Sequence, residues 1–280
     1  GVAIHKRQGS GSLGVVTWLR CRAVASCVVN SYRSGAGLAK VCTPPSLSID
    51  GHTDTDAFSW QNENNKESIF EVQARADAIN PTSQGIQYTN LQGVRGAGPW
   101  DLGWGWNVPT ASLVNAYAVG DKRKDGTILF SGQSDGIYGR VLPAYPAVIP
   151  RAYWNKKVYP NPATQSAKGQ RQAGWYNQKV IRYADVLLMA AEAANEVGGA
   201  GNAALAEDWV NEIRTRAGLG DVTFTTQAAM RTTIQNERRF EMALDGERFF
   251  DLVRWNLAST VLGPSGYQNR HRYYPIPQSA

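Results

Sequence analysis

Charged residues between positions 237 and 255 form the densest group of side chains that could do chemistry. The run holds four arginines, five carboxylates and four aromatic residues, interleaved along the chain. Two carboxylates facing a cleft could act as the acid and base of a glycoside hydrolase. The neighbouring arginines argue against this chemistry, because they favour the ionised carboxylate and lower its pKa. The carboxylates to which this argument applies are Glu237, Glu241, Glu247 and Asp251.

The same residues are expected to form a structural ion-pair cluster. Charges that lie against large apolar side chains persist when they are paired and hydrogen-bonded. Upstream, Arg182 and Asp185 are three positions apart and therefore share one face of a helix. The predicted cluster comprises Arg182, Asp185, Glu237, Arg238, Glu241, Arg248, Asp251 and Arg254.

A second group of candidate residues lies in irregular, Gly- and Pro-rich sequence. Three tryptophans near position 100 stand among glycines, so little side-chain bulk shields their rings. Sugar rings present apolar C–H faces that stack on flat indoles, while amide and carboxylate groups bind hydroxyls. The predicted glycan-binding residues are Trp100, Trp104, Trp106, Asp101, Asn107, Tyr138 and Trp154. The alternative for each tryptophan is burial, with the ring pinning the loop onto the body of the protein.

Metal and cofactor sites find no support in the sequence, and neither group is expected. The three histidines, His5, His52 and His271, are scattered, with no ligand at metal-binding spacing. The glycine-rich stretches 96–98 and 198–201 lack the Lys-Ser/Thr of a phosphate loop and the strand of a dinucleotide fold. Both stretches are interpreted as turns or helix ends.

The charge distribution divides the chain into two parts. The whole chain carries a net charge of +6, but residues 1–49 hold six cations and no Asp or Glu. Subtracting six from 29 leaves 23 cations, which balance the 23 acids of residues 50–280. This neutrality argues against nucleic acid as a partner. All three cysteines also lie in residues 1–49, and we interpret that segment as poorly ordered or non-native.

The remainder is expected to be one truncated domain, mainly α-helical, with long irregular loops. Apolar periodicity predicts a helix from about Val180 to the glycines at 198–199. A second helix, capped by Asn202, and a third at about 227–245 follow. A short helix is expected at 111–118 with Thr110 as its N-cap, and an extended segment at 67–73. Paired helices with a short glycine-rich link are typical of tetratricopeptide-type hairpins.

Several motifs, in order, resemble the SusD/RagB family of outer-membrane nutrient-uptake lipoproteins. The resemblance covers about residues 56–280 and begins with residues 67–71 (ESIFE). It continues through residues 181–193 (IRYADVLLMAAEA) and 211–218 (NEIRTRAG). It closes with 237–241 (ERRFE), 246–255 (GERFFDLVRW) and 274–278 (YPIPQ).

This resemblance implies a SusD-like helical fold and a non-catalytic role. Such a protein binds oligosaccharide or polysaccharide at the cell surface and delivers it to a SusC-like TonB-dependent transporter. The family is held to the outer membrane by an amino-terminal lipid, and we expect the signal and anchor to be absent from this chain. Two other classes stay open: a glycan-active hydrolase and a purely structural helical subunit.

Overall fold

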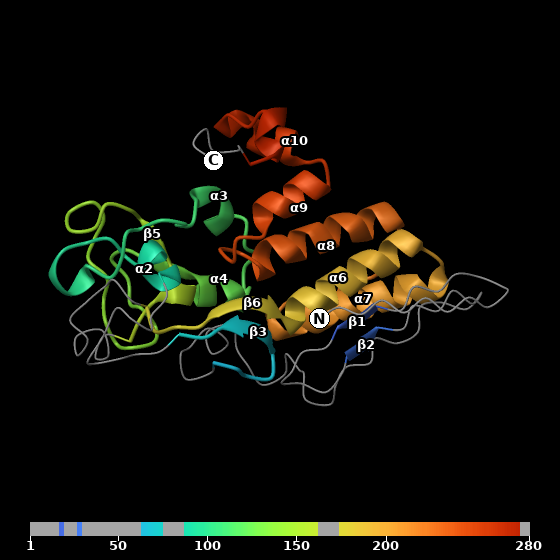
Figure 1. Cartoon of the computed structure of the whole chain (residues 1–280), viewed down its shortest axis with the longest axis horizontal. Coiled ribbons are helices and arrows are strands. Elements are labelled where there is room, and N and C mark those ends of the chain that lie inside the picture. Colours follow the sequence, from blue (N-terminus) through green and yellow to red (C-terminus); the bar gives the residue numbers. More distant parts are fainter. Residues whose placement is uncertain (1–16, 20–26, 30–62, 75–86, 162–173, 275–280) are drawn as a thin grey trace.

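The computed structural model describes residues 17–19, 27–29, 63–74, 87–161 and 174–274 (Figure 1). Its largest element is a layer of three helices, α6 (Tyr183–Val197), α7 (Ala200–Arg216) and α8 (Gln227–Glu241). Figure 1 shows α6 beside both α7 and α8, in agreement with their contacts. The expectation of a mainly helical protein is therefore confirmed.

The hairpin of α6 and α7 is closed by two consecutive glycines. Gly198 and Gly199 have φ values of +74° and +88°, which L side chains rarely adopt. The predicted cap is wrong, since α7 begins at Ala200 and Asn202 lies inside its first turn. There the Asn202 amide donates to the carbonyl oxygen of Gly198 at 2.6 Å, so it ties α7 back to the end of α6.

Strand pairing shortens the first predicted helix at its start. Residues Gln178–Arg182 form strand β6, which pairs antiparallel with β3 (Ser68–Val72). The extended segment predicted at 67–73 is thus confirmed, and α6 begins at Tyr183 rather than near Val180. Apolar periodicity could not distinguish these states, because the strand depends on a partner more than 100 residues upstream.

Short elements and loops fill the region between β3 and β6. They are α2 (Tyr88–Gln92), η2 (Gly98–Trp100), α3 (Ala111–Val114), α4 (Lys122–Thr127), β4 (Ile128–Phe130), β5 (Tyr153–Asn155) and η3 (Lys156–Val158). β4 and β5 pair antiparallel. The predicted cap of α3 is confirmed, since the Thr110 hydroxyl accepts from the Leu113 N–H at 3.3 Å, although the helix is shorter than 111–118.

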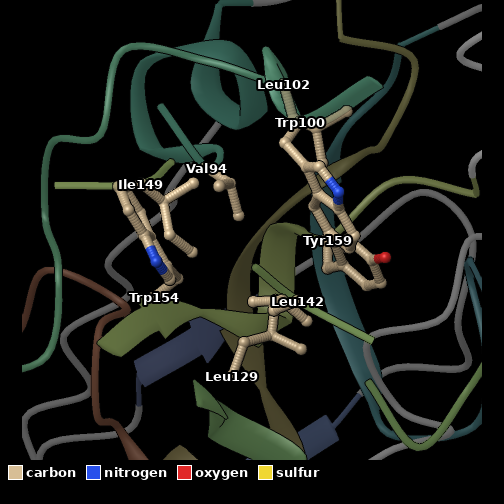
Figure 2. Close-up of a cluster of buried hydrophobic side chains, with 8 residues drawn as sticks. All are labelled: Val94, Trp100, Leu102, Leu129, Leu142, Ile149, Trp154 and Tyr159. Carbon is tan, nitrogen blue, oxygen red and sulfur yellow. The ribbon is translucent and has the colours of Figure 1, made fainter. Parts of the chain in front are cut away.

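This loop-rich region has an apolar core of its own. Figure 2 shows the core side chains meeting from several loops and from both strands of the β4–β5 pair. Trp154 of β5 is fully buried, and Leu129 of β4 is 1% exposed. The cluster comprises Val94, Trp100, Leu102, Leu129, Leu142, Ile149, Trp154 and Tyr159.

The third helix ends four residues before its predicted end. α8 stops at Glu241, and the turn that follows contains Leu244 at φ +67° and Gly246 at φ +97°. After this turn come α9 (Arg248–Arg254), α10 (Ala258–Leu262), η4 (Gly263–Ser265) and η5 (Asn269–Arg272). In the amino-terminal segment, β1 (Thr17–Leu19) pairs with β2 (Cys27–Val29). The rest of residues 1–49 and residues 275–278 lie outside the described residues.

A buried ion-pair network joins the helical layer to the loop-rich region. Glu241, at the end of α8, pairs with Arg182 of β6 at 2.7 Å and with Arg216 of α7. Both arginines also pair with Glu67, which precedes β3, at 2.7 and 2.9 Å. Side chains from three elements and from the segment before β3 therefore meet at one point. The network comprises Glu67, Asp121, Arg123, Lys157, Arg182, Arg214, Arg216, Glu237, Glu241 and Asp245.

Arg123 of α4 extends this network toward the loops. Its guanidinium contacts Asp121 and Glu237, each at 2.8 Å. Burial alone would lower the pKa of Arg123, but the neighbouring carboxylates outweigh that effect and raise it. The arginine is therefore held charged inside the protein, and α4 is fixed against α8.

A second set of ion pairs fixes α9 against α6 and α8. Arg238 pairs with Asp185 of α6 at 2.6 Å and with Asp251 of α9 at 2.9 Å. Arg254 contacts Asp251 at 2.8 Å and also pairs with Glu192. The run of charges at 237–255 thus lies at the junction of these three helices.

Three expectations about these charges are corrected. Arg182 and Asp185 bind different partners, because one ends a strand and the other lies in the first turn of a helix. Among the described residues, Arg248 has no carboxylate within ion-pair distance, and it donates to the Gln235 carbonyl at 3.5 Å. Burial raises the pKa of Glu247, helped by Asp185, in spite of the adjacent arginines.

Replacing Glu241 by Gln is expected to lower the free energy of unfolding by about 3–5 kcal/mol. The change leaves buried guanidinium groups without their balancing charge, and they cannot be resolvated. Denaturant titration of both proteins measures the difference. Glu196→Gln is the matched control, since Glu196 and Arg231 pair at the surface, with side chains 44% and 40% exposed. Equal losses in the two variants would contradict the importance assigned to the buried network.

Stability is also expected to fall in acid because of Glu241. Burial favours the protonated form of this carboxyl, but Arg216, Arg182 and Arg123 outweigh burial and hold its pKa well below the ordinary value of 4.5. The folded protein therefore binds fewer protons than the unfolded chain, and this contribution is lost as pH falls below that ordinary value. Denaturant titrations between neutral and acid pH should show a steeper decline for the native sequence than for Glu241→Gln. Parallel curves would contradict the assignment.

Candidate functional site

The tryptophan loop, defined as residues 100–107, is held against the stretch formed by residues 90–94. Four backbone hydrogen bonds join the two. Leu102 donates to Val94 at 2.9 Å, Trp104 to Asn90 at 2.8 Å, Gly105 to Gly93 at 3.0 Å and Trp106 to Leu91 at 2.8 Å. The loop is therefore a fixed surface feature rather than an open connection.

Two glycines let these backbones cross. A Cβ at Gly103 would lie 2.4 Å from the Asn90 carbonyl oxygen and 2.7 Å from the Gly93 Cα. A Cβ at Gly93 would lie 2.4 Å from the Leu102 carbonyl oxygen. Neither position has room for a side chain, because the obstructing atoms belong to the backbone. From the sequence, the glycines were expected only to leave the tryptophan rings unshielded. In the structure, Gly93 and Gly103 also allow the two backbones to pack closely.

The crossing leaves two indole rings at the surface. Trp104 is 40% exposed and Trp106 is 61% exposed, both high for the largest apolar side chain. Gly105, which stands between them, has φ +69° and packs against the buried ring of Trp154. The guanidinium of Arg95 lies 6.0 Å from the centre of the Trp104 ring. The arrangement offers apolar ring faces with a cation beside one of them.

Two other predicted tryptophans lie inside the protein. Trp154 is fully buried, and its Nε1 donates to the Ser131 hydroxyl at 3.2 Å. Trp100 is 8% exposed; the Arg140 guanidinium lies 3.9 Å from the centre of its ring, and the Tyr159 ring is stacked parallel to it with centres 6.5 Å apart. Figure 2 shows both tryptophans among the apolar core residues. Both rings are buried and therefore act as structural supports of the loop-rich region.

The predicted polar residues take different positions around the loop. Tyr138 is half-buried and packs against Tyr159 with ring centres 5.6 Å apart, and burial raises its pKa. Asp101 is half-buried at the end of η2, where its N–H donates to the Gly98 carbonyl at 3.1 Å. Asn107 remains exposed at φ +49°, directly after Trp106. Trp104, Trp106 and Asn107 are thus the predicted residues that lie together at the surface.

Asn107 also anchors the tryptophan loop to the body of the protein. Its Nδ2 donates to Gln92 Oε1 at 2.6 Å and to the carbonyl oxygen of Leu244 at 2.8 Å. Leu244 precedes Asp245, which pairs with Lys157 at 2.9 Å and Arg182 at 3.0 Å. The loop is therefore connected through one asparagine to the buried ion-pair network.

Gln92 is a site residue that the sequence did not reveal. Its Oε1 accepts from both Asn107 and Asn155 of β5, the latter at 2.9 Å, while its Nε2 donates to the Tyr88 carbonyl. It thereby joins α2, the tryptophan loop and β5. A lone glutamine before a glycine carries no distinctive pattern, and only the fold brings its partners together.

Within the described residues, His, Cys, Asp and Glu form no group of three that could hold a metal ion. No described helix has the length and apolar character needed to cross a membrane.

Comparison with known proteins places this geometry in context. A profile described as the SusD family matches residues 66–280. Among curated proteins, SusD-like protein P2 of Formosa agariphila is 27% identical over 235 residues. That alignment covers 76% of this chain and 45% of the relative.

Two solved structures share the fold at similar identity. Surface glycan-binding protein A from Bacteroides uniformis has 26% identity and a TM-score of 0.64, over 84% of this chain and 50% of that one. A laminarin-binding SusD-like protein has 27% identity and a TM-score of 0.63, over 81% of this chain and 50% of that one. The chain spans about half the length of these proteins. Since the family profile extends over well more than half of it, the chain belongs to the SusD family.

Proposed function

We propose that this chain is part of a cell-surface protein that binds oligosaccharides by stacking them on Trp104 and Trp106. The observation that carries the proposal is the exposure of two large aromatic rings on a rigid loop. Apolar side chains of this size are normally buried, so a fixed exposed pair indicates a binding surface. A shallow stacking surface also suits a protein that must release what it captures.

The relatives support a carbohydrate as the ligand. Two solved structures above 25% identity are named for glycan binding, one of them for laminarin. Laminarin is therefore the first polysaccharide to test. The same family membership supports a location at the outer membrane and delivery of the sugar to a TonB-dependent transporter.

A non-catalytic role agrees with the state of the carboxylates. A hydrolase needs an acid and a base facing a cleft about 5–10 Å apart. The carboxylates of the buried network, such as Glu67, Glu237 and Glu241, are instead bound to arginines inside the protein. These carboxylates are buried and bound to guanidinium groups, so they are removed from contact with a sugar.

A purely structural role is less consistent with the tryptophan loop. That alternative requires all three clustered tryptophans to be buried, yet only Trp100 is. Four backbone hydrogen bonds hold the other two rings outward at the surface. A structural subunit gains nothing from such an arrangement, whereas a binding surface depends on it.

Replacing Trp104 or Trp106 by Ala is expected to weaken laminarin binding about five- to tenfold each. Each change removes one aromatic stacking contact, worth about 1 kcal/mol, while the loop backbone stays bonded to residues 90–94. Calorimetry or affinity electrophoresis measures the loss. Tyr273→Ala is the control, because it removes a ring that is 73% exposed from the opposite end of the sequence. Unchanged retardation of both tryptophan variants by every glycan tested would refute the proposed surface.

Replacing Asn107 by Gly is expected to lower both stability, by about 1 kcal/mol, and glycan affinity. Glycine keeps the left-handed backbone but removes the side chain that binds Gln92 and Leu244. Asn256→Gly is a matched control, since Asn256 is exposed and has a similar φ of +59°. Thermal unfolding and calorimetry together measure the two effects. Identical behaviour of the two variants would show that the side-chain anchor is unimportant.

A further inference from the structure

A small cavity lies beneath the tryptophan loop. Its volume is about 10 Å³, and its wall includes Thr89, Asn90, Leu102, Val158, Trp175 and Tyr176. Asn90 is also the residue whose carbonyl oxygen accepts the Trp104 N–H, and Leu102 belongs to the loop itself. The cavity therefore borders the backbone on which the exposed indoles are mounted.

The side-chain amide of Asn90 contributes a buried hydrogen-bond donor to this wall. Asn90 is only 7% exposed, and its Nδ2 is buried with no hydrogen-bond acceptor among the residues that the structure describes. An unsatisfied buried donor costs about 1–3 kcal/mol, and folded proteins rarely retain one. We therefore expect the amide nitrogen of Asn90 to donate a hydrogen bond to a bound molecule.

The dimensions of the cavity restrict what that ligand can be. A volume of about 10 Å³ for the centre of a water-sized sphere is near the minimum for one water molecule and too small for a sugar ring. The wall also contains Thr89 and Tyr176, whose hydroxyl groups can both donate and accept a hydrogen bond. Water in a buried site needs two to four such partners.

We propose that this cavity is a hydration site that holds one ordered water molecule, bound to Asn90 Nδ2. The water joins α2 to the segment 174–176, which leads into β6. It thereby fixes the residue that supports Trp104, and Asn90 is a positioning residue for the tryptophan loop. Neither the water nor its contact with Asn90 depends on the identity of the surface ligand.

Crystallography of the native sequence and of two Asn90 variants tests the site directly. Asn90→Leu keeps much of the volume but removes both amide atoms, whereas Asn90→Asp keeps a polar group that a water can bind. We expect one water near Asn90 Nδ2 in the native protein, a water in Asn90→Asp and none in Asn90→Leu. A dry native cavity would overturn the proposal, and so would a water retained in Asn90→Leu. If Asn90→Leu does not fold, the native structure alone decides.

Hydrogen exchange tests the positioning role without any glycan. The Trp104 amide is bonded to the Asn90 carbonyl, so loss of the water should increase its exchange rate several-fold in Asn90→Leu. Asn115→Leu is the control, because Asn115 is exposed at the end of α3. Equal Trp104 exchange in the two variants would overturn the positioning role.

Discussion

The fold depends on neutralising charge that has no access to water. Glu241 is 3% exposed, and isolated burial of its carboxylate would be prohibitive. Its guanidinium partners come from β6 and α7, and a third arginine, Arg123 of α4, lies 3.8 Å away. Each partner can reach Glu241 only if its own element is correctly placed. Charge balance therefore specifies the relative positions of these elements more strictly than apolar packing alone.

The buried ion-pair network is connected to the surface through the turn after α8, which contains Leu244 and Asp245. Asp245 pairs with Arg182 and Lys157, and the preceding residue, Leu244, accepts a hydrogen bond from Asn107. Burial favours the neutral form of Lys157 and lowers its pKa, although Asp245 opposes that effect. The tryptophan loop is in this way connected to the buried ion-pair network by the side chain of Asn107. The loop itself contributes backbone bonds, the glycine crossing, the Asn107 side chain and two core side chains, Trp100 and Leu102.

Patterns local in sequence predicted much of the fold. The three long helices, the Thr110 cap and the extended segment near residue 70 all follow from periodicity or capping chemistry. The start of α6 did not, because β6 exists through pairing with a distant strand. The acidic partner Glu67 was missed for the same reason. Local composition carries no information about which segments the fold brings together.

The candidate site shows the same limit. Trp100 and Trp104 both lie in glycine-rich sequence, yet one is buried beside Arg140 and Tyr159 while the other is exposed. Residue type identified both rings as candidates, but it could not distinguish a buried, supporting ring from an exposed one. The Glu247 carboxyl has a raised pKa despite adjacent arginines, since burial and nearby carboxylates decide it.

The glycine crossing at positions 93 and 103 has a consequence for how such a site can change over time. The backbone bonds that fix the loop involve no atoms of the two exposed rings. Substitutions at positions 104 and 106 are thereby uncoupled from folding, whereas the two crossing glycines are not free to vary. Under the proposed function, side chains at positions 104 and 106 can be exchanged, and the ligand preference changed with them, while the glycine crossing and the rest of the protein are left intact.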